Sequence, residues 1–127
     1  MEQVGKYGIL AGNWEDAEER FMEVISMVEK PTIEEAAERL AVTMADGEKK
    51  YFMVFGNYVL TPEVFEKLEK NISEGRTSRG EYQLTDALEA VRAEAGMTGY
   101  RIAGRAYDIG NPAAYRRTLN SFGTGND

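Results

Sequence analysis

The chain has 127 residues and a net charge of −7, and it contains neither histidine nor cysteine. This length suits one domain with a buried core. The lack of cysteine excludes disulfides and thiolate zinc sites, and the lack of histidine removes the commonest general base. Any chemistry therefore depends on carboxylates, lysines, hydroxyls, backbone amides and a hard metal ion.

The charge pattern also narrows the class of partner. Nucleic-acid binding needs a clustered basic face, whereas the arginines of this chain are dispersed among acids. No apolar run approaches the ~20 residues of a membrane span. Residues 1–7 lack the basic start and apolar stretch of a signal peptide. We therefore expect no nucleic-acid or membrane partner, and a cytoplasmic location.

The first elements in chain order are two strands. Residues 7–11 are short and apolar, which predicts a strand, and the polar residues 12–20 predict an exposed loop. Alternating apolar residues from position 21 to 28 predict a second strand. Pro31 ends it, since proline lacks the amide needed for pairing.

A helix is expected after this proline. Thr32 and Glu35 have the spacing of a capping box, in which each side chain accepts from the other residue's backbone amide. The helix should run to about Leu40. Its predicted inner face consists of Ile33, Ala36, Ala37 and Leu40.

The middle of the chain contains a turn, a strand and a second helix. Asp46-Gly47 marks a turn within residues 41–50, which we expect to be an exposed excursion. Residues 51–60, rich in aromatic and β-branched side chains, predict a mostly buried strand, with Gly56 as a bulge or close approach. Thr61-Pro62 then begins a helix. Its apolar stripe is Val64, Phe65 and Leu68.

The C-terminal third predicts two further helices and a hairpin. Polar residues 71–80 suggest a loop, and apolar residues at helical spacing from Leu84 to Val91 predict a helix that stops at Gly96. Short strands are expected at 99–103 and 106–109, joined at Gly104-Arg105. Asn111-Pro112 begins the last helix, with Tyr115, Leu119 and Phe122 along one face, and residues 123–127 should fray.

Strands and helices that alternate in this way predict an α/β fold with a layered sheet. With so few strands, at least one sheet edge should stay unpaired unless another chain or a further segment covers it.

The tripeptide Glu29-Lys30-Pro31 is the first candidate site, because ligands of open α/β sheets gather at strand ends. An ammonium there suits a phosphate, and a neighbouring carboxylate suits sugar hydroxyls. The alternative, and for the tripeptide alone the commoner case, is a solvated Glu-Lys pair in a turn.

Asp108 is the second candidate. It lies in Tyr-Asp-Ile-Gly-Asn-Pro at residues 107–112, at the end of a predicted strand and before a helix start. Such a carboxylate suits Mg²⁺, which binds through one or two carboxylates plus substrate phosphates. The alternative is an Asx turn or a helix cap. One carboxylate does not hold magnesium firmly by itself.

Two weaker candidates complete the set. Gly8, in a strand, permits close approach by a ligand or simply marks a bulge. Glu81 precedes a helix start and is interpreted chiefly as structural. The chain has no Gly-rich phosphate loop or dinucleotide fingerprint.

Four segments in this order (28–31, 58–65, 78–88 and 107–112) make the chain resemble the C-terminal half of a sugar-1-phosphate nucleotidyltransferase. Within that family it is most similar to the bacterial UTP–glucose-1-phosphate uridylyltransferase branch. The family's nucleotide loop, a Gly-rich stretch followed by a Pro-Lys pair, is absent. Residues 41–51 look like an insertion.

The resemblance implies a partial Rossmann-like nucleotide-diphospho-sugar transferase fold, with a mixed sheet flanked by helices. Residues 1–127 would be the sugar-phosphate-binding part of the domain. The N-terminal nucleotide-binding part would be a separate partner, and a homo-oligomer is expected. The isolated chain would be inactive.

The resemblance also assigns roles to residues. Gly8 would lie against the sugar ring, Glu29 would bind sugar hydroxyls, Lys30 would contact the sugar phosphate and serve catalysis, and Asp108 would bind Mg²⁺. The implied reaction converts UTP and glucose 1-phosphate to UDP-glucose and pyrophosphate. A non-catalytic assembly or sugar-phosphate-binding module derived from the family is the alternative.

Overall fold

The computed structural model describes residues 4–78, 80–104 and 106–122. Its main sheet has the strand order β5-β1-β2-β6, and each of its three pairings is antiparallel. The strands are β1 (Gly8–Trp14), β2 (Phe21–Glu29), β5 (Phe52–Met53) and β6 (Thr98–Tyr100). A separate hairpin joins β3 (Val42–Thr43) to β4 (Lys49–Lys50).

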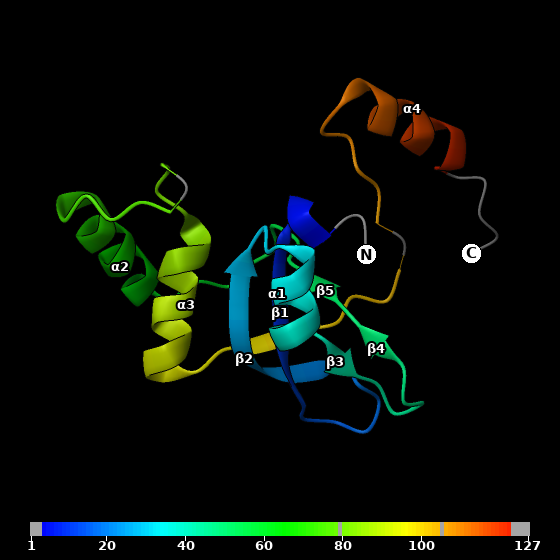
Figure 1. Ribbon diagram of the computed structural model, residues 1–127, viewed down its shortest axis with the longest axis horizontal. Helices are drawn as coiled ribbons and strands as arrows, with labels where there is room; N and C mark the ends of the chain where they lie inside the picture. Colours follow the sequence, from blue (N-terminus) through cyan, green and yellow to red (C-terminus); the bar gives the residue numbers. More distant parts are fainter. Residues whose placement is uncertain (1–3, 79, 105, 123–127) are drawn as a thin grey trace.

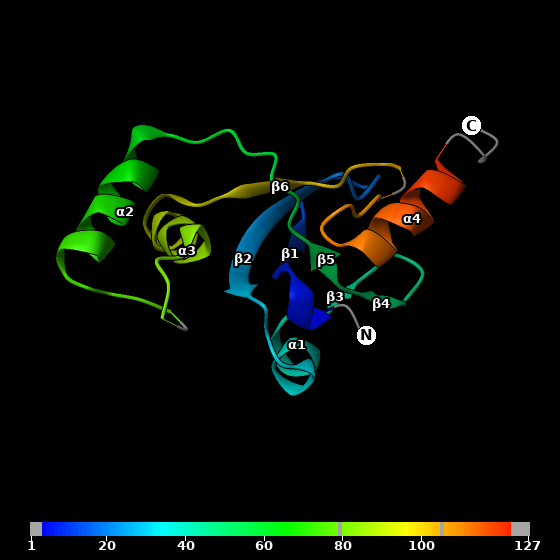
Figure 2. The ribbon, with the colours of Figure 1, turned by 90° about the horizontal axis from the view of Figure 1, so that it is seen from above.

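A short 3-10 turn and four helices surround the sheet. They are η1 (Val4–Lys6), α1 (Ile33–Arg39), α2 (Pro62–Ser73), α3 (Leu84–Ala95) and α4 (Pro112–Ser121). Helices α2 and α3 lie side by side on the flank of β2 (Figures 1 and 2). Helix α4 stands on the opposite flank, at the end of a long extended segment (Figure 1). The α/β class is confirmed, but the antiparallel pairings mean that the described strands do not form the mixed sheet that was expected.

Two hydrophobic clusters hold these layers together. The first packs α1 onto β1 and is centred on Ile9, Ala36 and Leu40, each with no exposed surface. The second packs α2 and α3 against β2, with Met27 and Leu88 buried between them. Because both clusters include β2 or its partner strand, the end of β2 is held from both sides.

The first strand is longer than its sequence suggests. It continues to Trp14, so residues 12–14 belong to the strand and the prediction of a loop from residue 12 was wrong. The register shifts between Ala11 and Gly12, and a Cβ on Gly12 would lie 2.0 Å from the Glu23 carbonyl oxygen. The bulge that sequence analysis considered at Gly8 is therefore at Gly12, where only a glycine allows the strands to approach so closely.

Two strand predictions were wrong. Of residues 51–60 only Phe52–Met53 pair, residues 55–59 are exposed, and open space surrounds Gly56. Residues 106–109 form no strand either, and Arg105 lies outside the described residues. The physical reason is the same in both cases, because a strand needs a neighbour and no described strand lies beside these segments.

The helix signals in the sequence were more reliable. The Thr32 hydroxyl accepts from the Glu35 amide at 3.1 Å, although the Glu35 carboxylate lies near Arg39 (3.5 Å) in a salt bridge. The predicted inner face of α1 holds for Ala36 and Leu40 but not for Ile33, which is 49% exposed, or for the exposed Ala37.

Helices α2 and α4 begin at the prolines that predicted them, whereas α2 and α3 have no side-chain cap at their first turn. Helix α2 starts at Pro62 but extends to Ser73, which shortens the expected loop, and α3 ends at Gly96 with φ 80°. The Asn111 side chain caps α4 by accepting from the Ala114 amide at 2.9 Å. The predicted fraying of residues 123–127 lies outside the described residues.

Apolar side chains on α4 face outward. Ala114 is its buried residue, whereas Tyr115, Leu119 and Phe122 are 49%, 58% and 69% exposed. The same is true of Val59, whose exposure reaches 102%. The excursion at residues 41–50 is mostly exposed, as predicted, although Val42 and Met44 are buried within it. No helix in the described part of the chain is both long and apolar enough to cross a bilayer.

Candidate functional site

The Glu29-Lys30-Pro31 segment lies at the rim of the sheet, where β2 ends beside the start of β1. Glu29 pairs with Gly8, and the Lys30 amide donates to the Tyr7 carbonyl at 3.1 Å. Lys30 adopts φ 46°, in the left-handed region that side chains other than glycine rarely occupy. The chain therefore turns sharply at this residue, and the turn brings the Lys30 ammonium back to 3.9 Å from Glu29 Oε1.

The Glu29 carboxylate is held from several sides. Thr85 Oγ1 donates to Glu29 Oε2 at 2.7 Å, and a Cβ on Gly8 would lie 3.0 Å from the same oxygen. The Glu29 side chain is only 21% exposed. Gly8 thus leaves room for the carboxylate against the strand, and Thr85 fixes where the carboxylate points.

A tyrosine from another segment completes these surroundings. Tyr58 is 40% exposed, and its partial burial raises its pKa above the ordinary value of 10.0, with the negative charge of Glu29 raising it further. The Tyr58 ring lies in the segment that follows β5, far from Glu29 along the chain. Sequence reasoning did not assign Tyr58 or Thr85 to the site. For Thr85, a hydroxyl on the first turn of a helix was the available signal.

Asp108 lies in a different environment. Its Oδ1 accepts from the Gly110 amide at 2.8 Å, and its Oδ2 accepts from the Tyr7 hydroxyl at 3.4 Å. The Thr118 hydroxyl donates to the Asp108 carbonyl at 2.7 Å, which ties this segment to α4. The bond to Gly110 is that of an Asx turn, the structural alternative for this residue.

A cavity of about 560 Å³ opens between residues 53–56 and α4, and Asp108, Tyr7 and Arg117 line it. Neither Glu29 nor Lys30 is among its lining residues. Glu29 instead lines a smaller hollow of about 330 Å³, together with Ser78, Gln83 and Asp86. Glu29 and Asp108 therefore open into different hollows of the described surface, and Lys30 lines neither of them.

Tyr7 connects the two groups. Its carbonyl accepts from the Lys30 amide and its hydroxyl donates to Asp108, so one residue separates them. Glu81, predicted to be chiefly structural, is exposed and accepts from Gln83 Nε2 at 2.9 Å.

The surroundings of Asp108 suit a single metal-ligand contact. Its two oxygens accept one hydrogen bond each and keep lone pairs for another partner. Among the described residues, no three acidic side chains gather closely enough to hold a metal ion. These residues fit a magnesium ion only as one carboxylate that is completed by other ligands, such as substrate phosphates.

A carboxylate and an ammonium thus lie together at the end of β2, and one hydroxyl from helix α3 holds the carboxylate. The chain belongs to the Nucleotidyl transferase family, whose profile matches residues 1–123.

Two relatives have names that are more specific than the name of the family. The chain is 33% identical over 119 residues to the UTP–glucose-1-phosphate uridylyltransferase of Pseudomonas aeruginosa, covering 94% of this chain and 37% of that protein. It is 34% identical over 126 residues to UTP–glucose-1-phosphate uridylyltransferase 1 of Staphylococcus saprophyticus, covering 96% of this chain and 37% of that one.

A solved structure of a UDP-glucose pyrophosphorylase in complex with UDP-glucose superposes with a TM-score of 0.72 and 33% identity. The superposition covers 95% of this chain and 40% of that one. The chain thus spans well under half the length of the proteins it matches.

Proposed function

We propose that this chain is the C-terminal, sugar-phosphate-binding part of a UTP–glucose-1-phosphate uridylyltransferase. The observation that carries the proposal is the Glu29 carboxylate, fixed beside the Lys30 ammonium at the end of β2. The named relatives support the same reaction class. The cytoplasm is the location we propose.

In the proposed reaction, Glu29 accepts hydrogen bonds from sugar hydroxyls and Lys30 pairs with the sugar phosphate. A phosphate oxygen of glucose 1-phosphate attacks the α-phosphorus of UTP in line. A new P–O bond forms between the sugar phosphate and the α-phosphorus. The bond from the α-phosphorus to the oxygen that bridges to the β-phosphorus breaks, and pyrophosphate leaves. The nucleophile is already an anion, so no general base is required and the absence of histidine is no obstacle. Catalysis then depends on positioning and charge neutralisation.

Asp108 is the residue that we propose as this chain's magnesium ligand. The ion would neutralise charge on the phosphates. Asp108 is oriented for this by the Gly110 amide and the Tyr7 hydroxyl. The remaining protein ligands would come from the nucleotide-binding part, which we propose as the partner of this chain.

The sheet has room for such a partner. Strand β5 is an edge strand, and residues 55–59, which have strand-like composition, are exposed beside it. A further strand along this edge would satisfy the unpaired backbone groups and cover the apolar side chains.

The experiment that tests the proposal is a calorimetric titration of the 127-residue chain with glucose 1-phosphate, with and without Mg²⁺. We expect binding that Glu29→Gln and Lys30→Met each weaken by about tenfold or more, since each substitution removes a hydrogen bond to a charged group. The exposed Lys49→Met is the matched control. Failure of the unmodified chain to bind would overturn the proposal.

The second candidate is a non-catalytic assembly or sugar-phosphate-binding module. The exposed apolar side chains of α4 and of residues 55–59 favour it, because such surfaces serve association. Mixing the chain with a nucleotide-binding part and measuring UTP-dependent pyrophosphate release separates the two. Release supports the split enzyme, whereas a complex that forms without release supports the module.

A further inference from the structure

We infer that Thr85 is a positioning residue that holds the Glu29 carboxylate in the orientation required for sugar recognition; this inference rests on the proposed function. The Thr85 hydroxyl donates to Glu29 Oε2 at 2.7 Å across 56 positions of sequence, and the contact is partly buried. Neither residue is a sequence neighbour of the other. The contact therefore exists only because α3 packs against β2.

Helix α3 is well placed to set this geometry. Ala87, Leu88 and Val91 are buried against the body of the molecule, so the helix has little freedom to move. The Glu89 carboxylate also accepts from the Met27 amide at 3.2 Å. Thr85 and Glu89 are four residues apart and lie on one face of the helix.

These two contacts form a pair. Glu89 fastens the helix to the backbone of β2 at Met27, and Thr85 reaches the side chain two residues further along, which lies on the same face of the strand. The position of the Glu29 carboxylate is thereby determined by the helix and not by the flexible side chain alone.

The contact also gives the two oxygens of the Glu29 carboxylate different surroundings. Oε2 is occupied by Thr85 and lies where only a glycine at position 8 leaves room, whereas Oε1 faces the Lys30 ammonium at 3.9 Å. A ligand hydroxyl would therefore meet Oε1 on the side where Lys30 can reach a phosphate. Removing the Thr85 hydroxyl would free the carboxylate to rotate, and the match to one particular sugar hydroxyl would be lost.

The first test uses three variants and calorimetric titration with glucose 1-phosphate. Thr85→Val removes the hydroxyl at similar size and should weaken binding by about tenfold. Thr85→Ser keeps a hydroxyl and should bind nearly as the unmodified chain does. The control is Thr43→Val in β3, an exposed residue remote from Glu29, which should change nothing.

A double-variant cycle then asks whether Thr85 acts through Glu29. In a Glu29→Ala background, Thr85→Val should cause no additional loss, because its acceptor is gone. Equal losses in the serine and valine variants would overturn the inference, as would a full valine effect in the alanine background. Either result would indicate that Thr85 only supports the fold.

The second test needs no ligand, so it decides whether Thr85 orients the Glu29 side chain even if the proposed function fails. NMR couplings in selectively labelled chain report whether Glu29 occupies one side-chain rotamer. We expect one dominant rotamer in the unmodified chain and in Thr85→Ser, and rotamer averaging in Thr85→Val. A Glu29 side chain that stays equally ordered in the valine variant would exclude the positioning role. Failure of the unmodified chain to bind glucose 1-phosphate would instead count against the proposed function.

Discussion

Lys30 combines a strained backbone with a side chain beside the candidate sugar-binding carboxylate. Its φ of 46° lies in a region that costs a side-chain residue roughly 1–2 kcal/mol, and its ammonium is 3.9 Å from Glu29. Strain of this kind persists where the surroundings hold it in place, and it is found preferentially at functional positions. The turn at Lys30 is held by the Tyr7 carbonyl on one side and by the buried Pro31 on the other.

Two substitutions of Lys30 should differ in their effect on stability but not in their effect on binding. Lys30→Gly relieves the left-handed strain, offset in part by the greater entropy of glycine in the unfolded chain, so we expect a gain of about 0.5–1 kcal/mol over Lys30→Met. Both variants lose the ammonium and should bind glucose 1-phosphate equally poorly. Urea denaturation measures the stability difference. Equal stability of the two variants would show that the left-handed conformation is not strained here.

Tyr58 offers an independent probe of the Glu29 charge. Its pKa is raised by burial first and by Glu29 second, so Glu29→Gln should lower the Tyr58 pKa while leaving it above the ordinary value. A spectrophotometric titration of tyrosine ionisation measures this shift.

The same shift predicts how stability depends on alkaline pH. The pKa of Tyr58 is higher in the folded chain than in the unfolded chain. The stability that neutral Tyr58 contributes to the fold is therefore fully present below about pH 10, and it is lost as the pH rises through the folded-state pKa. If Glu29→Gln left the Tyr58 titration unchanged, the two side chains would not be neighbours in solution.

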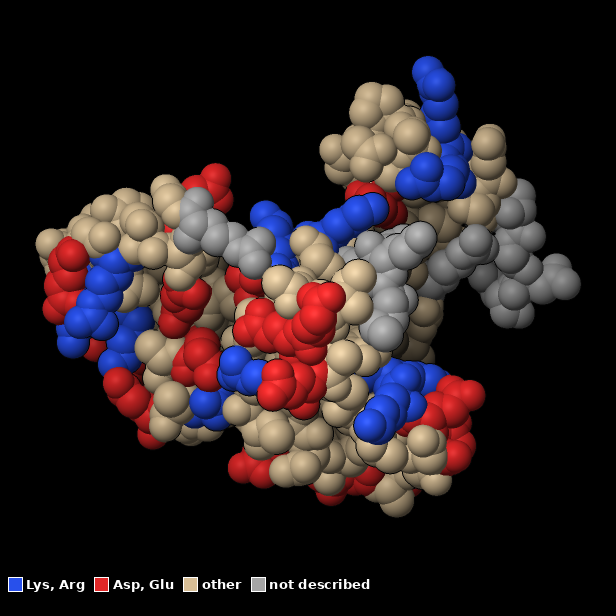
Figure 3. Space-filling view, in the orientation of Figure 1, with Lys and Arg blue, Asp and Glu red and all other residues tan. Residues whose placement is uncertain are grey.

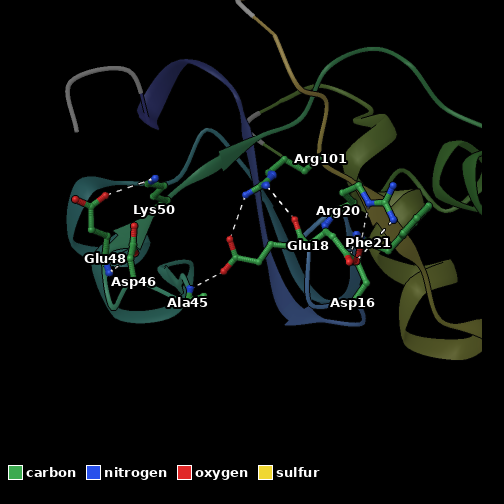
Figure 4. A network of polar contacts seen from close by, with 10 residues as sticks. Asp16, Glu18, Arg20, Phe21, Ala45, Asp46, Glu48, Lys50 and Arg101 are labelled. Atoms are coloured by element: carbon green, nitrogen blue, oxygen red, sulfur yellow. Dashed lines mark hydrogen bonds and ion pairs between the residues drawn. The ribbon is translucent and has the colours of Figure 1, made fainter.

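At the scale of elements, the loop between β1 and β2 is organised by charged side chains (Figure 4). Asp16 Oδ1 accepts from the amides of Arg20 and Phe21, each at 2.8 Å. Arg101 extends from the end of β6 to Glu19 Oε2 (3.3 Å) and to the Glu18 carbonyl (3.1 Å). The loop thus bonds to the residue that follows β6, the edge strand next to β2.

This loop should make stability sensitive to acid. The backbone amide of Phe21 is the main cause that lowers the pKa of Asp16 below 3.8, with Arg20 adding to it. Because the pKa of Asp16 is lower in the folded chain, the stability that its carboxylate contributes is present above pH 3.8. It is lost as the pH falls through the folded-state pKa. We therefore expect Asp16→Asn to be less stable than the unmodified chain at neutral pH.

The difference in stability between Asp16→Asn and the unmodified chain should shrink as the pH falls. Thermal unfolding midpoints measured across the acid range provide the check. A constant difference at every pH would mean that the ionised carboxylate contributes nothing.

At the scale of the whole molecule, large apolar side chains are exposed on several elements, including Phe65 on α2, which belongs to the predicted apolar stripe of that helix but is 61% exposed. Helix α4 forms a separate lobe in the space-filling view (Figure 3), and its Leu119 and Phe122 are more than half exposed. Val59 lies entirely in solvent. Surfaces of this kind mark interfaces, in agreement with a chain that spans 37% of its curated relatives.

Val59→Lys tests that interpretation. With 102% exposure, Val59 has no packing to lose, so the stability of the isolated chain should stay within about 0.5 kcal/mol. If the exposed segment is where the nucleotide-binding part pairs, the charge should weaken complex formation at least tenfold in a sedimentation or calorimetric assay. Ile33→Lys, on the far side of the sheet in α1, is the control. Equal affinity of both variants would place the interface elsewhere.

The sequence by itself determined the elements whose causes are local. The caps of α1 and α4, the proline at the start of α2 and the glycine at the end of α3 each depend on contacts within a few residues. The rim position of Glu29 and Lys30 also followed from sequence, because a strand that meets a proline must end there.

Only the tertiary structure decided the rest. Residues 55–59 have the composition of a strand yet remain unpaired, since pairing depends on a neighbour and not on propensity. Thr85 lies 56 positions from Glu29, and Tyr7 lies 101 positions from Asp108, so no local pattern links either pair. Side chains that meet across such separations are brought together by the packing of helices on a sheet, which a linear pattern does not encode.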